Sequence, residues 1–200
     1  MPPSDEALVA AYIDRDDQAA FRLLIERHQE RVFGYLMGMV RDRSVANDLF
    51  QETFLRVIAA MRRDRGSYTR QGKWLYWVMR IARNAALDHL RTRKKWRDVD
   101  AAERDGSFWD RLPDGVPPVD QQVAVRQQVD LLEACIERLP PEQREVLLLR
   151  HETDLTFREI ADLTDVSINT ALGRMRYALI NLRKMMNEQL EEDGERIRAH

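Results

Sequence analysis

The chain has a single cysteine, no long apolar run and no basic segment at its N-terminus. Because Cys135 is alone among 200 residues, no disulfide can form within the chain. Apolar runs such as residues 146–149 are far too short to span a bilayer. The N-terminal sequence MPPSDEALVA is acidic, whereas a signal peptide begins with basic residues. We therefore expect a soluble cytoplasmic protein without membrane insertion.

Glycine and proline are also sparse, at 8 and 7 residues. No segment alternates apolar and polar side chains in the way that a half-buried strand does. The hydrophobic fraction of 44% is enough to bury a core in one large domain or two small ones. These properties predict an all-α fold.

The formal net charge of −2 hides a segregation of charge along the chain. Residues 61–97 have 12 basic and 2 acidic side chains, residues 98–145 have 5 basic and 12 acidic ones, and residues 171–186 have 4 basic and no acidic ones. A solvated protein surface usually mixes both signs. Two positive blocks on either side of a negative connector favour a polyanionic partner, because each cation that neutralises a phosphate releases counterions.

Apolar periodicity predicts a bundle of about four helices in the first half. A long amphipathic helix follows Asp16 and Asp17 and continues to Met39, and Ser44 is expected to cap the next one. A third helix is expected over about residues 73–95, with a short N-terminal helix around residues 8–13.

Residues 96–120 contain glycine and proline among acids and show no sustained period, which is typical of a linker. Helical periodicity resumes near Gln121 and restarts after Pro140 and Pro141. The expected fold is therefore two small helical domains, an N-terminal bundle and a C-terminal helix-turn-helix domain, joined by an acidic flexible linker. The expected boundaries are 1–96 for the first domain, 97–120 for the linker, 121–190 for the second domain and 191–200 for a polar tail, with fraying beyond Asn187.

Residues 156–177 have the pattern of two short helices joined by a tight turn. Thr156 and Glu159 are spaced as a capping box, and Ser167 is placed to cap the second helix. Asp165 stands where a left-handed residue is needed, and Ala161 is small enough for close helix crossing. This is the pattern of a helix-turn-helix whose second helix enters the DNA major groove. A helical hairpin that only packs remains the alternative.

The third predicted helix combines aromatic and basic residues. Trp74, Tyr76 and Trp77 cluster at its start, and arginines and lysines occupy the face opposite its apolar stripe. Bases of single-stranded nucleic acid stack on such rings at about 1 to 3 kcal/mol each while cations hold the phosphates. Alternatively, Trp74 and Trp77 fill the core, as large aromatics at helical spacing usually do.

Three segments together resemble successive signatures of bacterial RNA polymerase sigma factors: DLFQETFLRVI at residues 48–58, WLYWVMRIARNAALDHLRTRKK at 74–95, and LPPEQREVLLLRHETDLTFREIADL at 139–163. The compact two-domain form resembles the extracytoplasmic function group of the sigma-70 family. The resemblance covers about residues 17–186. It implies a factor that binds core RNA polymerase and directs promoter recognition, DNA melting and transcription initiation.

The resemblance implies that the first segment binds the clamp of the polymerase, with the contact made by Asp48, Gln51, Glu52 and Phe54. Asp48 and Glu52 are also spaced i, i+4 on one helix face with Gln51 beside them, so they form an ordered polar patch. A metal site is the competing interpretation of these carboxylates. No histidine stands three residues from either of them, and we expect no metal.

The resemblance also implies that the loop at 64–72 and the following helix open the minus-ten element of the promoter and hold a flipped base. Flipping costs a few kcal/mol per base, which stacking and hydrogen bonding in a pocket offset. The matching residues are Ser67, Tyr68, Arg70, Lys73, Trp74, Arg83, Asn84, Asp88 and Arg91.

In the second domain the resemblance implies reading of the minus-35 element. The expected contacts are Ser167, Asn169, Thr170, Arg174 and Arg176, with Arg183 and Lys184 nearer the phosphates or the polymerase flap. Leu172 and Gly173 depart from the family pattern and have no side-chain donor for base edges. We therefore expect readout of DNA shape to contribute more than direct contacts to bases. The linker is expected to thread through the polymerase, although a plain tether would have a similar composition.

The implied partners are core RNA polymerase, through its clamp and flap regions, promoter DNA, and an anti-sigma factor that holds the idle protein. The alternative is a helix-turn-helix transcriptional regulator, of the LuxR type, that is not a polymerase subunit. Such regulators usually have an α/β receiver domain, whose strands this sequence lacks. The four histidines are scattered without a catalytic constellation, so we expect neither an enzyme nor a cofactor.

Overall fold

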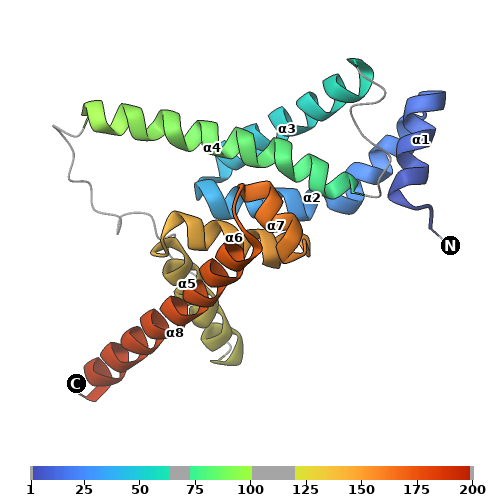
Figure 1. Cartoon of the computed structure of the whole chain (residues 1–200). Coiled ribbons are helices and arrows are strands. Elements are labelled where there is room, and N and C mark those ends of the chain that lie inside the picture. Colours follow the sequence, from blue (N-terminus) through green and yellow to red (C-terminus); the bar gives the residue numbers. More distant parts are fainter. Residues whose placement is uncertain (1, 64–72, 101–119, 199–200) are drawn as a thin grey trace.

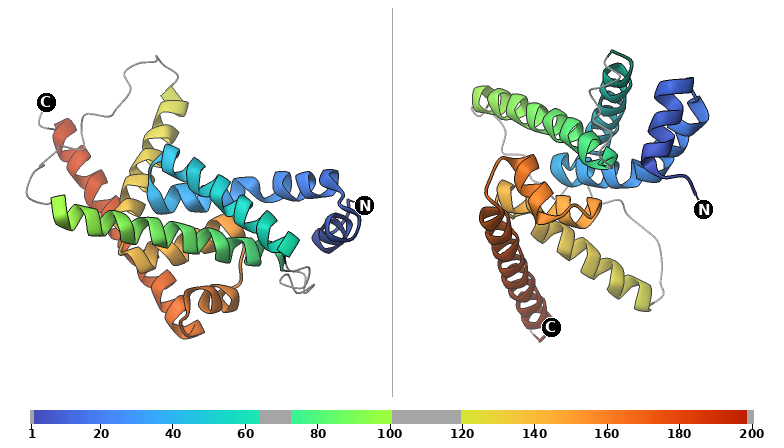
Figure 2. Two further views of the ribbon diagram at one scale, coloured as in Figure 1. Left: turned by 90° about the horizontal axis from the view of Figure 1, so that it is seen from above. Right: turned by 45° about the vertical axis from the view of Figure 1, so that its right-hand side comes forward.

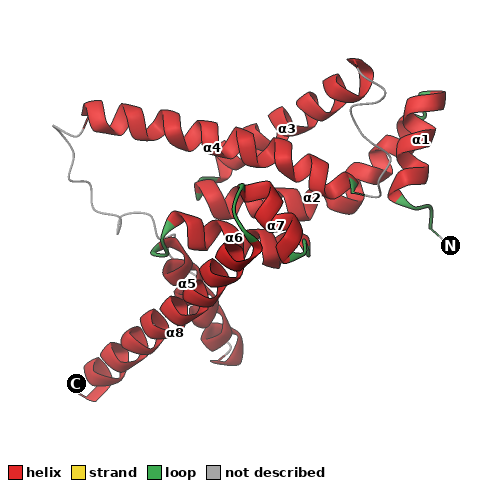
Figure 3. Cartoon of the chain, viewed as in Figure 1, coloured by secondary structure: helices red, strands yellow, loops and turns green. Residues whose placement is uncertain are grey.

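The computed structural model describes residues 2–63, 73–100 and 120–198. In these ranges the chain forms helices and no strand, which confirms the predicted all-α class (Figure 3). No helix in them is both long and apolar enough to cross a membrane. The helices are α1 Asp5–Arg15, α2 Gln18–Val40, α3 Arg43–Arg63, α4 Trp74–Asp100, α5 Asp120–Glu137, α6 Pro141–Thr153, α7 Phe157–Thr164 and α8 Ile168–Arg198.

Aspartates form several helix boundaries of the N-terminal bundle. Asp16 ends α1 with a left-handed φ of 53°, and the carboxylate of Asp17 accepts the N–H groups of Ala19 and Ala20 at the start of α2. The expected cap at Ser44 is wrong. Asp42 caps α3 instead, because its carboxylate accepts the backbone N–H of Ser44 at 2.9 Å and the helix already begins at Arg43.

The helix-turn-helix forms as predicted. Thr156 and Glu159 make the reciprocal capping box at the start of α7, and Asp165 adopts the left-handed conformation with φ 56°. The hydroxyl of Ser167 accepts the N–H of Thr170 at 3.0 Å, which caps α8. Ala161 is buried in the angle between the two helices.

Two helices are longer than the sequence pattern indicated. Helix α4 continues to Asp100 rather than ending near Lys95, because no glycine or proline interrupts it before Gly106. Helix α8 continues through Arg198, where fraying was expected beyond Asn187. Its last turns contain the good helix formers Glu, Gln, Leu and Arg, and a single glycine is not enough to end them.

The N-terminal and C-terminal helices lie directly against each other. Helix α6 packs along α2, and α7 lies beside the first turns of α4 (Figures 1 and 2). Two glycines allow the close approach: a Cβ at Gly38 would lie 2.5 Å from Leu148 Cδ2, and one at Gly34 would collide with the carboxylate of Glu152. One continuous hydrophobic cluster therefore extends through both halves of the chain.

Candidate nucleic-acid interface

Helix α4 presents one open polar strip. Arg80, Asn84, Asp88 and Arg91 are exposed and recur at helical spacing, so they line one face. Asp88 and Arg91 approach each other at 3.7 Å, a surface ion pair of little energetic consequence. The strip offers both cations for phosphates and an amide that can pair with base edges.

A second group of residues, at and near the start of α4, contacts the C-terminal helices. Lys73 Nζ lies 3.4 Å from the carboxylate of Glu159 in α7, and the Tyr76 hydroxyl donates to the carboxylate of Asp162. Burial, followed by this hydrogen bond, raises the pKa of Tyr76 to about 12. Partial burial opposes ionisation of Glu159, but hydrogen bonds from Thr156 and Lys73 outweigh it and lower the pKa of that carboxyl.

Arg83 makes the least exposed of these contacts. Its Nε donates to Glu145 Oε1 in α6 at 2.8 Å, and only 17% of the arginine side chain and 8% of the glutamate side chain are exposed. The hydroxyl of Tyr35 lies 3.5 Å from the same carboxylate oxygen. Burial and the negative charge of Glu145 hold the pKa of Tyr35 well above its ordinary value, so the tyrosine stays a neutral donor.

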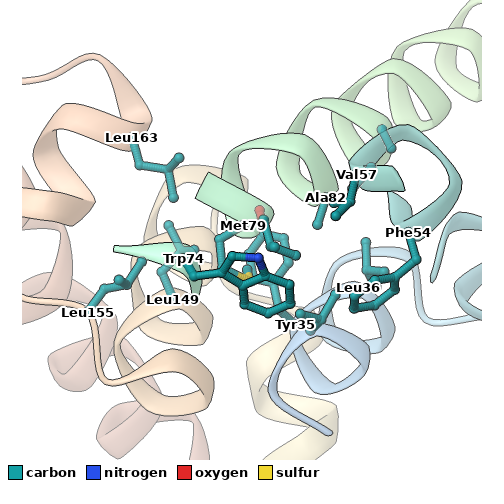
Figure 4. Close-up of a cluster of buried hydrophobic side chains, with 14 of the residues drawn as sticks. Tyr35, Leu36, Phe54, Val57, Trp74, Met79, Ala82, Leu149, Leu155 and Leu163 are labelled. Atoms are coloured by element: carbon teal, nitrogen blue, oxygen red, sulfur yellow. The ribbon is translucent and has the colours of Figure 1, made fainter. Parts of the chain in front are cut away.

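Trp74 lies in the core, with 1% of its surface exposed. Its ring centroid is 5.2 Å from that of His28 and 6.5 Å from that of Phe54. In the view of Figure 4, Leu149, Leu155 and Leu163 of the C-terminal half lie on one side of the indole, and Tyr35, Leu36 and Phe54 of the N-terminal bundle lie on the other. The core-packing interpretation of Trp74 therefore holds in this arrangement.

The indole Nε1 of Trp74 is buried, and no described residue offers it a hydrogen-bond partner. The three loop residues expected to help hold a flipped base, Ser67, Tyr68 and Arg70, lie outside the described residues. Trp77, the other candidate for core packing, is half-buried.

Helix α3 offers a separate surface. Asp48 and Gln51 are exposed, and Glu52 pairs with Arg56 one turn later at 2.6 Å. Phe54, expected on this surface, is buried against Phe50 with ring centroids 4.8 Å apart.

The outward hydrophobic residue of α3 is Leu55, which is 66% exposed. The sequence signal for it was its position one residue from Phe54, on the face that includes Asp48 and Gln51. Among the described side chains, no three acidic, histidine or cysteine groups gather as a metal site would require.

The first turns of α8 are largely open. Asn169, Thr170 and Arg176 are exposed and Arg174 is half-buried, while the Ser167 hydroxyl is engaged with Thr170. Leu172 is 44% exposed, and a Cβ added at Gly173 would meet nothing within 4 Å. The face of α8 that is predicted to contact DNA is thus accessible, and Leu172 and Gly173 lie at its centre.

Two family models match the chain in order. The model described as Sigma-70 region 2 matches residues 24–96, and the one described as Sigma-70, region 4 matches residues 130–177. The first match covers α4 and the surface of α3, and the second covers the helix-turn-helix.

Two sigma factors match this chain over most of their own length. The chain is 37% identical to RNA polymerase sigma factor CarQ of Myxococcus xanthus over 172 residues, which is 86% of this chain and 91% of CarQ. It is 30% identical to ECF RNA polymerase sigma factor RpoE of Cereibacter sphaeroides, over 90% of this chain and 94% of that one.

Two solved structures have the same fold. The sigma factor RpoE in complex with the anti-sigma factor NepR from Bartonella quintana aligns with a TM-score of 0.62 at 18% identity, over 84% of this chain and 96% of that one. CnrH in complex with the cytosolic domain of CnrY aligns with a TM-score of 0.64 at 19% identity, over 93% of this chain and 99% of that one.

Proposed function

The chain belongs to the sigma-70 family of RNA polymerase sigma factors, in the extracytoplasmic function group, and on this premise we propose how its residues divide the work of transcription initiation. As a member of this family it directs promoter recognition and transcription initiation. The observation on which this function rests is the ordered pair of region 2 and region 4 matches on two helical units.

The minus-ten element is assigned to the N-terminal unit, residues 1–96. Its open strip, Arg80, Asn84, Asp88 and Arg91, has the spacing and chemistry to contact phosphates and base edges along one helix. Lys73, Trp74 and Arg83, together with Ser67, Tyr68 and Arg70 of the preceding loop, complete the proposed site for the melted strand. A role of Trp74 and Arg83 at that strand requires the C-terminal helices to move away from α4.

Core polymerase is assigned to the exposed side of α3. Asp48, Gln51 and Glu52 provide polar groups, and Leu55 provides an exposed apolar anchor among them. An apolar residue ringed by polar ones is the usual arrangement of an interface hot spot. Phe54 supports this surface from inside the core rather than touching the polymerase clamp.

The minus-35 element is assigned to α8 in the C-terminal unit, residues 121–190. Asn169, Thr170 and Arg176 can reach base edges, and Arg174 can reach a phosphate. Ser167 contributes by fixing the start of the helix. The apolar Leu172 and the open Gly173 permit close approach to the groove without adding hydrogen bonds, so readout of DNA shape contributes there.

The remaining assignments concern partners and chemistry. Sigma factors are generally non-catalytic subunits, and we assign this chain no enzymatic activity, cofactor or metal. We place it in the cytoplasm with core polymerase, whose flap would receive Arg183 and Lys184. Its fold neighbours RpoE and CnrH were solved with an anti-sigma factor and with the cytosolic domain of CnrY, and we propose an anti-sigma partner for this chain too.

Run-off transcription with purified core polymerase tests the proposal. The full chain plus core enzyme should yield transcripts of defined length from a subset of genomic promoter fragments, and neither component alone should do so. A helix-turn-helix regulator that is not a polymerase subunit would instead bind duplex DNA alone and give no core-dependent transcripts. That second result, with core binding also absent, would overturn the assignment.

A further inference from the structure

We propose that Arg41 and Arg144 form a binding site for a phosphate group, where the end of α2 meets the start of α6. A single carboxylate lies beside the two guanidinium groups, that of Glu137 at the end of α5. We call these three residues the arginine junction. The site goes beyond the proposed function, and its test does not depend on that function.

The register of α2 against α6 brings the two arginines together. A Cβ at Gly34 would meet Glu152 of α6. A Cβ at Gly38, one turn further along α2, would meet Leu148, one turn earlier in α6. The two helices therefore run antiparallel, and the next turn of the same register places the end of α2 opposite the first turn of α6.

Both positions at this crossing carry an arginine. Arg41 ends α2 in the left-handed conformation with φ 58°, and Arg144 lies in the first turn of α6. Burial, followed by the positive charge of Arg41, lowers the pKa of Arg144, and the charge of Glu137 opposes this effect. The two cations are therefore close enough to repel each other.

The charges of the arginine junction do not balance among the described residues. Arg41 pairs with Glu137, and 26% and 30% of these two side chains are exposed. The Nε of Arg144 is buried, and no described residue accepts a hydrogen bond from it. Asp42, the next carboxylate after Arg41, is turned to α3, where it accepts two N–H groups of the first turn. Two half-buried cations thus have one carboxylate beside them.

A phosphate group fits this arrangement chemically. A guanidinium group presents its N–H donors in a planar fork that matches two phosphate oxygens, and it stays charged at neutral pH. A phosphate between the arginines would reduce their mutual repulsion. Arg144 is half-buried rather than enclosed, so rotation of its side chain can bring the unpartnered Nε to the same anion.

Phosphate groups can come from two sources, free phosphate compounds and the DNA backbone. No residue of the arginine junction is among those assigned to the minus-ten or minus-35 element, which favours a free phosphate compound. Because the junction includes α2, α5 and α6, such a ligand would contact both halves of the chain.

Three substitutions in the full chain test the site. Arg144→Gln removes one of the cations, and Glu137→Gln removes the competing carboxylate at nearly constant volume. Arg138→Gln is the matched control, because this exposed arginine follows Glu137 directly but is not among the charges that act on Arg144. None of these residues is assigned to DNA or polymerase.

The first measurement is the melting temperature by circular dichroism, with inorganic phosphate or with chloride at equal ionic strength. Phosphate at about 10 mM should raise the wild-type value by about 3 to 6 °C, as expected at a tenfold excess over a millimolar dissociation constant. Arg144→Gln should lose this shift, Arg138→Gln should keep it, and Glu137→Gln should enlarge it.

The second measurement, fluorescence anisotropy of a labelled DNA duplex of mixed sequence, distinguishes the two sources of phosphate. Equal duplex affinity for wild type and Arg144→Gln, with the phosphate shift lost in the variant, identifies a free phosphate compound as the ligand. Weaker duplex binding by Arg144→Gln, with the same loss of the shift, would assign the phosphate group to the DNA backbone.

Absence of a phosphate shift in wild type would overturn the proposal. So would an equal shift in wild type and Arg144→Gln, because phosphate would then act without the arginine junction. Loss of the shift in Arg138→Gln as well would attribute it to net charge alone and would also overturn the site. Absence of transcripts in the run-off assay would instead overturn the proposed function and leave the phosphate site in place.

Discussion

Arg83 Nε and Glu145 Oε1 lie 2.8 Å apart although 62 residues separate them in the chain. The arginine belongs to α4, whose exposed strip is assigned to the minus-ten element, and the glutamate belongs to α6. One ion pair thus joins the two units that we propose contact separate promoter elements. The same side chain cannot pair with Glu145 and contact a phosphate at the same time.

Asn84→Ala should slow promoter opening without weakening binding to core polymerase. The side chain is exposed on α4 and packs against nothing that the fold requires, whereas loss of an amide that pairs with a base edge costs about 1 to 3 kcal/mol. Permanganate reactivity of the melted strand, followed over time with saturating core enzyme, measures the opening. Arg22→Ala, an exposed cation on α2, is the control. Equal loss of core binding and opening would indicate misfolding instead.

Trp74→Ala should destabilise the whole fold, by about 3 to 5 kcal/mol, as expected for a large aromatic removed from a packed core. Core binding and DNA binding would then fall together. Urea denaturation followed by circular dichroism measures the change, with Trp77→Ala, at a half-buried neighbour, as the comparison. A stable Trp74→Ala protein would contradict the packing described for Trp74.

Leu55→Glu should abolish core-polymerase binding while leaving the thermal melt near that of wild type. The side chain is 66% exposed on the face of α3 that includes Asp48 and Gln51, so a charge there is well solvated in the free protein but buried in the complex. Co-purification with tagged core enzyme measures the effect. Retention of full binding would move the polymerase surface away from α3.

Gly173→Ala should raise the free energy of unfolding by about 0.5 to 1 kcal/mol, because alanine favours a helix interior and its Cβ meets nothing within 4 Å. If DNA approaches this position closely, the same variant should bind a minus-35 duplex less tightly. Chemical denaturation and duplex titration separate the two effects. A loss of stability would contradict the open environment of the residue.

Mild acid should weaken the N-terminal bundle through His28. Burial lowers the pKa of this histidine below 6.5, although Asp5, which hydrogen-bonds it at 2.7 Å, opposes the shift; Arg27 and Arg31 reinforce it. The unfolded chain binds the proton more readily, so stability that is present above pH 6.5 is lost as the pH falls below it. Melting temperatures between pH 7.5 and 5.5 should fall for wild type and fall less for His28→Asn. An equal decline in both would exclude His28 as the cause.

Local sequence signals were sufficient to predict the helix-turn-helix and its caps. The capping box at Thr156, the left-handed Asp165 and the cap at Ser167 each depend on residues within three positions, and all three were predicted. The predicted cap at Ser44 was wrong for a local reason too. Asp42 and Ser44 are both good capping residues, two positions apart, and the sequence does not show which of them caps the helix.

The contact between the two units has no local signal. Trp74 and Leu149 meet only because α6 docks on α2, and neither residue shows this in its neighbours. Gly34 and Gly38 were the one available hint, since two glycines four apart on an otherwise regular helix mark a close approach. The family motifs therefore predict which residues contact DNA, but they do not predict that Trp74 and Arg83 contact the C-terminal helices.

Energy transfer between two dyes tests the account most directly, because it follows the distance between the two units in the free protein and in the polymerase complex. The dyes are attached to cysteines introduced at Glu30 on α2 and Arg158 on α7, which are exposed positions, whereas the native Cys135 is only 1% exposed. Transfer should be high in the free chain and low once core polymerase and promoter DNA are bound. Equal transfer in the free chain and in a complex that is making transcripts would contradict the account.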